Sequence, residues 1–286
     1  HLAVRVPVTS EIGRRFGLDA LTWAKEDLTD MIVLSNWFTP TNFDIPVERW
    51  KAELGASPCL IVPGADAAIS LAQNKTIKQM NNSIETMRGF AVSSFHRGAD
   101  AIYIFNNFMI PYKTQTVQPD GSVTTSNDRT RALSELGSLA TAINGPRTHV
   151  LTFTSPSLTP EPTLPRSLAA QQTLSFDLPI GPRPANGHCT LHVALDACPT
   201  VAAAELAVSV NAQPCRWSRD LPRDRNYTYN NTRVWHVVKN VAETGARVLA
   251  FDVPLAALQS GSNRITIMNP TANPLAITWL ELALTD

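Results

Sequence analysis

Polar side chains stand where each of four apolar segments in the first 110 residues ends. A carboxylate can transfer a proton or stabilise positive charge, amides and a guanidinium bind hydroxyl groups, and an indole stacks on an apolar ring face. This combination favours binding of a polar, ring-shaped ligand together with acid–base chemistry. The residues in these positions are Arg5, Asn36, Trp37, Asp66, Asn106 and Asn107.

The apolar segments predict four β-strands that alternate with helices. The predicted strands are 2–6, 31–34, 59–62 and 101–105, and the predicted helices are 18–28, 46–54, 84–97 and 131–143. Strands that are apolar throughout and joined by helices indicate a parallel sheet covered on both faces. The carboxyl ends of parallel strands meet at one rim, so we expect the polar residues to converge there.

The repeated strand–helix units fit a doubly wound sheet or a (β/α)8 barrel. No GxGxxG or Walker sequence follows a strand, so the nucleotide-binding form lacks its fingerprint. Four units make half of a barrel. Because His1 lies inside an apolar segment, we expect a fragment or processed chain whose first four units lie elsewhere, on the same parent chain or another chain.

The character of the sequence changes near residue 148. A Pro-rich linker at 155–165 is followed by short alternating segments separated by Gly, Asn, Asp and Pro, which predicts an antiparallel β-sandwich, specifically a jelly roll. We therefore expect two domains, 1–147 and 148–286. Residues 216–229 are expected to form a long loop that either binds a sugar or a partner or packs against the barrel.

A sugar suits the rim residues, because Trp37 could stack on a pyranose ring while Arg5, Asn36, Asn106 and Asn107 bind hydroxyls. Capping the core is the alternative role for Trp37.

Glycoside hydrolysis usually needs two carboxyl groups. Asp66 is the first candidate, Asp44 the second and Glu11 the third. The alternatives are that Asp44 caps the helix at Pro46 and that Asp66 caps a turn. A second catalytic carboxylate could also lie in the absent units.

Composition excludes several other classes. Lys and Arg number 24, Asp and Glu also number 24, and only 17% of residues are charged, so no nucleic-acid partner is expected. No apolar run is long enough for a transmembrane helix. The histidines show no ligand spacing and no serine lies in GxSxG, which disfavours a metal, a cofactor or serine chemistry. A disulfide among Cys189, Cys198 and Cys215 stays open.

Four stretches resemble glycoside-hydrolase-like TIM-barrel proteins, whose barrels end in an RGADGIYLFN strand. They are GLDALTWAKEDLTDMIV, NFDIPVERWKAELG, IVPGADAA and IETMRGFAVSSFHRGADAIYIFNNF. Ala101 replaces the usual Gly, and Asp66 keeps a common acidic position. The resemblance extends through ALSELGSLATAI and HVLTFT into a galactose-binding-like jelly roll. It implies carbohydrate chemistry and the second half of a barrel.

We therefore expect a glycoside hydrolase-like protein with its pocket at the carboxyl rim of the barrel strands. The alternatives are a non-catalytic carbohydrate-binding protein and an assembly in which another chain completes the half barrel. The sequence leaves the compartment open, with a secreted or periplasmic location among the alternatives.

Overall fold

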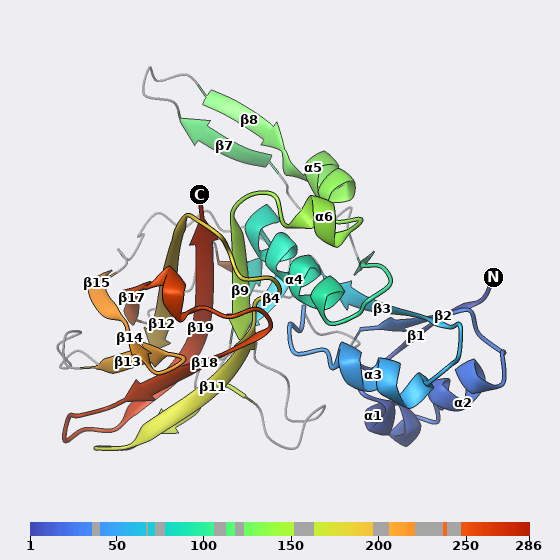
Figure 1. The fold of residues 1–286 in the computed structure, drawn as a ribbon, viewed down its shortest axis with the longest axis horizontal. Coiled ribbons are helices and arrows are strands. Elements are labelled where there is room, and N and C mark those ends of the chain that lie inside the picture. Colours follow the sequence, from blue (N-terminus) through green and yellow to red (C-terminus); the bar gives the residue numbers. More distant parts are fainter. Residues whose placement is uncertain are drawn as a thin grey trace.

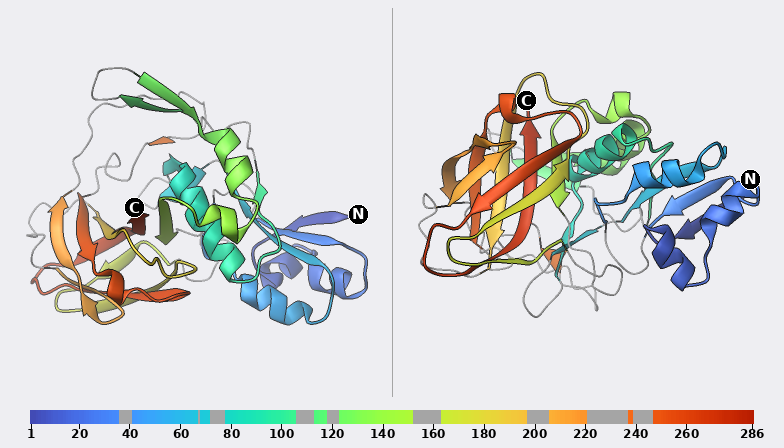
Figure 2. Two further views of the ribbon diagram at one scale, coloured as in Figure 1. Left: turned by 45° about the horizontal axis from the view of Figure 1, so that its top comes forward. Right: turned by 60° about the horizontal axis from the view of Figure 1, so that its bottom comes forward.

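A parallel sheet and a pair of antiparallel sheets lie on opposite sides of helix α4 (Ile84–His96) in the computed structural model of the protein (Figure 1). The views in Figure 2 keep this arrangement. The structure describes residues 1–35, 41–66, 68–71, 78–105, 113–117, 123–151, 163–196, 206–220, 237–238 and 247–286.

The parallel sheet is built from the four expected apolar segments. Its strands are β1 (Ala3–Val6), β2 (Met31–Leu34), β3 (Leu60–Ala65) and β6 (Tyr103–Ile104). Their order is β1-β2-β3-β6, and every pairing is parallel. Each new strand is added on the same side, so these strands lack the reversal of order that marks a doubly wound sheet.

Three short helices connect the first strands and lie on one side of the sheet (Figure 1). They are α1 (Ser10–Arg15), α2 (Ala20–Lys25) and α3 (Val47–Leu54). Thr9 and Asp19 cap the first two, each accepting a hydrogen bond from a backbone N–H three residues ahead. In α3 the buried residues are Val47, Trp50 and Leu54, spaced so that they share one face.

The two faces of the parallel sheet differ in burial. Ile32, Leu34 and Ile61 point to the helices and are fully buried. We call the other side the open face; it carries Ala3, Arg5, Met31, Val33, Leu60, Val62, Tyr103 and Phe105. On this face Leu60 is 40% exposed and Tyr103 36% exposed, whereas Val33 and Val62 in its centre are 5% and 2% exposed. The helices α1, α2 and α3 cover the other side, so among the described residues the expected cover of both faces is present only in part.

The acids that precede the strands are structural, as their positions predict. Asp30 accepts a hydrogen bond from the backbone N–H of Leu2 at 2.6 Å. Asp100 accepts one from the N–H of Ile61 at 2.7 Å and is paired with Lys51. Both carboxylates satisfy backbone groups at the amino ends of the strands, away from the rim.

Two of the connections between the predicted strands and helices contain β-hairpins. The first pairs β4 (Ala68–Leu71) with β5 (Lys78–Asn81), directly after β3. The second pairs β7 (Lys113–Val117) with β8 (Val123–Asn127) and projects from the body of the protein (Figure 1). The expected helix 131–143 is split into α5 (Asp128–Glu135) and α6 (Leu139–Ala142).

The C-terminal half forms a six-stranded and a four-stranded antiparallel sheet, packed face to face around an apolar core. The first has the order β10-β19-β12-β17-β15, with β9 also on β19, and the second β11-β18-β13-β14. The strands are β9 (Arg147–Leu151), β10 (Arg166–Leu168), β11 (Thr173–Pro179), β12 (His188–Leu195), β13 (Ala207–Val210), β14 (Gln213–Pro214), β15 (Arg216–Asp220), β17 (Arg247–Val253), β18 (Ser262–Met268) and β19 (Leu275–Thr285). A short 3-10 turn, Leu255–Ala257, follows β17.

The two described ends of the segment 216–238 pair with different halves of the chain. Its first residues, Arg216–Asp220, form strand β15 where a loop was expected, and 221–236 lie outside the described residues. Further on, β16 (Val237–Val238) pairs in parallel with β5. A strand from the C-terminal half is thus hydrogen-bonded to the hairpin that follows β3.

The disulfide that the sequence left open does not form between the two described cysteines of the sandwich. Cys189 and Cys215 are both free, and Cys198 lies outside the described residues. Burial raises the pKa of Cys189 to about 12 and that of Cys215 to about 11. Both thiols therefore stay protonated at neutral pH and are poor nucleophiles.

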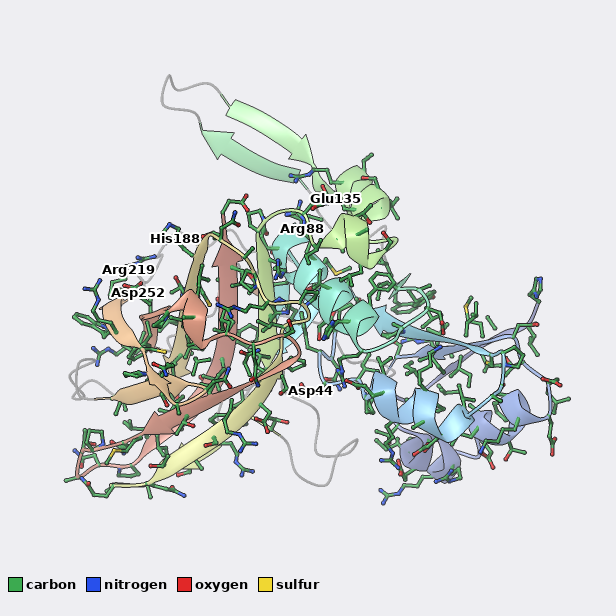
Figure 3. All side chains as sticks on the ribbon, viewed as in Figure 1. Asp44, Arg88, Glu135, His188, Arg219 and Asp252 are labelled. Carbon is green, nitrogen blue, oxygen red and sulfur yellow. The ribbon has the colours of Figure 1, made fainter. Side chains whose placement is uncertain are left out.

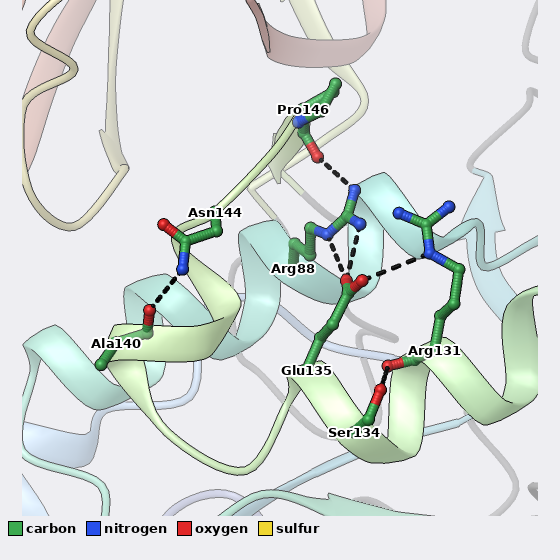
Figure 4. Close-up of polar contacts among 7 residues, drawn as sticks. All are labelled: Arg88, Arg131, Ser134, Glu135, Ala140, Asn144 and Pro146. Atoms are coloured by element: carbon green, nitrogen blue, oxygen red, sulfur yellow. Dashed lines mark hydrogen bonds and ion pairs between the residues drawn. The ribbon is translucent and has the colours of Figure 1, made fainter.

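A buried arginine fastens α4 to its neighbours (Figure 4). Arg88 is only 2% exposed, donates to Glu135 of α5 through Nε at 2.8 Å and contacts the same carboxylate through Nη2 at 2.6 Å. Its Nη1 donates to the carbonyl of Pro146 at 3.1 Å. Arg131 also donates to Glu135, at 3.2 Å. The carboxylate neutralises the buried charge and holds α5 against α4, and the bond to Pro146 holds the turn before β9.

Candidate active site

The carboxyl end of β3 is fixed by a small hydrogen-bond network. The Thr41 hydroxyl accepts from the backbone N–H of Asp66 at 2.9 Å and donates to its carbonyl at 3.0 Å. The Asn82 amide donates to the same carbonyl and to the Thr41 hydroxyl, both at 2.6 Å. Thr86 in turn donates to Asn82 at 2.9 Å. These bonds fix the backbone of Asp66 at the end of β3.

Asn82 also links this network to α4. It immediately precedes Ser83, the N-cap residue of the helix, whose hydroxyl accepts from the backbone N–H of Thr86 at 3.2 Å. The Thr86 hydroxyl accepts from the N–H of Ser83 at 2.8 Å, which completes a capping box. The longest described helix thus begins at the rim and anchors the end of β3.

An arginine and two aromatic rings occupy the open face near the same rim. The guanidinium carbon of Arg5 lies 4.0 Å from the centre of the Phe105 ring. The rings of Tyr103 and Phe105 are 6.3 Å apart between centroids and inclined by 30°. Because β1 and β6 are the outer strands of the sheet, the Arg5–Phe105 contact spans the whole open face.

Asp44 lies beside α3 (Figure 3) and does not cap that helix. Pro46 is the N-cap residue and no side-chain cap bond forms there. The backbone N–H of Asp44 donates to the Asn42 side chain at 2.9 Å. Burial raises the pKa of Asp44 to about 7, and the positive charge of Arg97 only partly opposes this shift. A carboxyl group with a pKa of about 7 keeps about half of its molecules protonated at neutral pH and can act as a general acid.

The raised pKa of Asp44 predicts a specific pH dependence of stability. The folded state favours the neutral acid, so its contribution is present below the unfolded pKa near 3.8 and is lost as pH rises through about 7. We expect Asp44→Asn to remove a loss of roughly 2 to 4 kcal/mol in unfolding free energy over that range. Urea denaturation at a series of pH values measures it. Glu26→Gln, at an exposed carboxylate, is the control and should leave the wild-type slope; an unchanged slope in Asp44→Asn would contradict the assignment.

Three of the predicted site residues lie in the described part of the chain. Arg5 lies on the open face, Asp66 follows β3, and Asp44 lies next to the helices. Glu11, the third carboxylate candidate, is paired with Arg49 on α3 and has a structural role. The remaining predicted residues, Asn36, Trp37, Asn106 and Asn107, are outside the described residues.

The sequence predictions missed residues that support this region. Tyr103 and Phe105 were assigned to a strand buried throughout, whereas both are at least partly exposed. Their i, i+2 spacing puts them on one face of a strand and could have indicated a shared aromatic surface. Thr41 and Asn82 come from loops, and no local pattern indicates that they meet.

Groups of three or more His, Cys, Asp or Glu side chains that could hold a metal ion do not occur among the described residues. In the same part of the chain, every helix is too short or too polar to cross a membrane.

No model of a known protein family matches the chain, and no curated protein matches it. Among solved structures, it is similar to a β-porphyranase of glycoside hydrolase family 86 from the human gut bacterium Bacteroides plebeius. That similarity has 10% identity and a TM-score of 0.33, and covers 99% of this chain and 62% of the other. It is also similar to BuGH86 in complex with neoagarooctaose, at 13% identity and a TM-score of 0.32, over 48% of this chain and 18% of the other.

Proposed function

We propose that this protein is glycoside hydrolase-like and acts on a carbohydrate at the carboxyl rim of its parallel sheet. The observation that carries the proposal is the fixed end of β3, where Thr41 and Asn82 hold the backbone of Asp66. Arg5 and its aromatic partner Phe105 lie on the open face of the same sheet. Carboxylate, guanidinium and aromatic groups are the combination that binds and cleaves a sugar.

The two carboxyl groups suit different roles. Asp44, with a pKa of about 7, is the candidate general acid that protonates the leaving oxygen. Asp66 is the candidate nucleophile or base. Arg5, together with Asn36, Trp37, Asn106 and Asn107, is proposed to bind the substrate. In this scheme no metal or cofactor takes part.

Replacing Asp66 tests the enzymatic proposal. Asp66→Asn keeps the size and backbone bonds of the residue but removes the carboxylate, so we expect hydrolysis to fall by at least about a thousandfold with an unchanged thermal transition. Chromatography of oligosaccharide products measures it. Asp30→Asn, at the opposite end of the sheet, should keep its activity. Wild-type turnover in Asp66→Asn would exclude the catalytic role.

A non-catalytic carbohydrate-binding protein is the alternative function. The open face supports it independently, because an aromatic pair and an arginine can bind a sugar without any carboxylate. Calorimetry would then show glycan binding by the wild-type chain, while chromatography shows no product.

The open face also supports the proposed architecture. We propose that 1–147 is the C-terminal half of a (β/α)8 barrel and 148–286 a jelly-roll sandwich. Within the described chain β1 pairs only with β2 and β6 only with β3, which leaves both outer strands as edges. Four further parallel strands, on the same parent chain or another, would pair with these edges and cover Leu60 and Met31.

A further inference from the structure

The aromatic pair of the open face has the form of a stacking platform. Tyr103 and Phe105 project from one strand to the same side, and Tyr103 is 36% exposed. The residue paired with Tyr103 is Gly64, and the Ser35 side chain packs against it, since a Cβ added at Gly64 would lie 2.8 Å from the Ser35 Cβ. An exposed aromatic surface at the carboxyl end of parallel strands lies where ligands bind in such sheets.

Arg5 adds a positive charge, which favours a ligand that carries a negative one. Its guanidinium carbon lies 4.0 Å from the centre of the Phe105 ring, which places the positive charge beside the aromatic pair. A ligand that stacks on Tyr103 would lie next to this cation. A planar fork of donors matches the geometry of a carboxylate or sulfate group.

We propose that Tyr103, Phe105 and Arg5 form the subsite for an acidic sugar, with the pyranose ring stacked on Tyr103 and its carboxylate or sulfate bound by Arg5. The inference deepens the proposed function, because it names an acidic glycan as the substrate class and rests on the same rim. Tyr103 and Phe105 are binding residues in this proposal, and no step of the chemistry is assigned to them.

Packing alone could also account for the aromatic pair, and the expected effects of substitution separate the two roles. Tyr103 is partly exposed, so Tyr103→Ala should change the thermal transition of the isolated chain little. Stacking on one ring corresponds to about a three- to tenfold change in Kd. Loss of a hydrogen bond to a charged group corresponds to about a ten- to hundredfold change.

Isothermal titration calorimetry on the 286-residue chain tests the subsite. The probes are hexagalacturonate for a carboxylate, a κ-carrageenan hexasaccharide for a sulfate, and cellohexaose as the neutral sugar. We expect at least one acidic probe to bind about tenfold or more tightly than cellohexaose. Tyr103→Ala should weaken that binding three- to tenfold, and Arg5→Gln ten- to hundredfold.

Two further variants make the result decisive. Phe105→Leu keeps an apolar side chain of similar size and should still lower the affinity for the acidic probe if the ring holds the guanidinium. Phe16→Ala removes another aromatic, 55% exposed next to α1, and should leave the affinity unchanged. Equal binding of neutral and acidic probes, binding of neither acidic probe, or equal losses in Phe16→Ala would overturn the subsite. Loss of hydrolysis in Asp66→Asn with any of these results would leave the proposed function standing without it.

Discussion

Replacing Gly89 by alanine should destabilise the protein by about 3 kcal/mol, despite the higher helix propensity of alanine. A Cβ at this position would lie 2.0 Å from the carbonyl oxygen of Thr148 and 2.6 Å from its carbonyl carbon. These are backbone atoms of β9, which is hydrogen-bonded to β19, so they cannot move aside as a flexible side chain could. The helix and the strand would have to separate.

The measurement is urea denaturation followed by circular dichroism, compared with Gly137→Ala. At Gly137 an added Cβ meets no atom within 4 Å, and the residue lies between α5 and α6. We expect the midpoint of Gly89→Ala to fall sharply and that of Gly137→Ala to stay close to wild type. Equal midpoints for the two variants would show that α4 does not pack closely on β9.

Acid should destabilise the protein through His149. This residue of β9 is only 1% exposed, and its ring nitrogens have no hydrogen-bond partner among the described residues. Burial lowers the pKa of His149 to about 3, and the positive charge of Arg147 adds to the effect. The fold therefore holds a neutral imidazole beside Leu282 on β19, where protonation would place a second cation near Arg147.

The direction in which stability changes with pH follows from the lowered pKa of His149. The stability contribution is complete above the unfolded pKa near 6.5 and is lost as pH falls through about 3. Between pH 6.5 and about pH 4 the loss from His149 should reach roughly 3 kcal/mol, and it opposes the gain that Asp44 makes over the same range. Relative to the wild type, His149→Leu should therefore gain roughly 3 kcal/mol on acidification. Its stability at neutral pH should be unchanged or higher, because the unpartnered nitrogens disappear.

Unfolding free energies from pH 4 to 7, measured with urea, check this expectation. His188→Gln is the matched control, because His188 is exposed on β12 and its replacement should leave the pH dependence of the unfolding free energy as in the wild type. If the unfolding free energy of His149→Leu changed between pH 7 and pH 4 as that of the wild type does, the effect would belong to other groups.

Local sequence patterns were enough to predict most elements of the parallel sheet. Strand β2 has the predicted bounds, and α4 ends one residue before the predicted helix. Both are set by neighbours in the chain: an apolar run for the strand, and Ser83 with the amphipathic spacing after it for the helix. Strand β6 is shorter than expected, because only Gly64 and Ala65 of β3 pair with it.

Sequence patterns do not predict strand pairing or burial that depends on residues far apart in the chain. Strand β19, the last of the alternating segments, lies between β12 and β9. Its alternating pattern shows two faces and not which strands flank it, because partners more than 80 residues away are invisible to periodicity.

For the candidate site, the sequence by itself determined the chemical types at the strand ends, Arg5 and Asp66 among them. Parallel strands that end in polar residues place those residues at one rim whatever the packing. Only the tertiary structure decided that Thr41 and Asn82 hold Asp66, because those bonds join separate loops. It also decided the pKa of Asp44 and the contact of Arg5 with Phe105, since burial and contact across a sheet arise only when distant segments pack together.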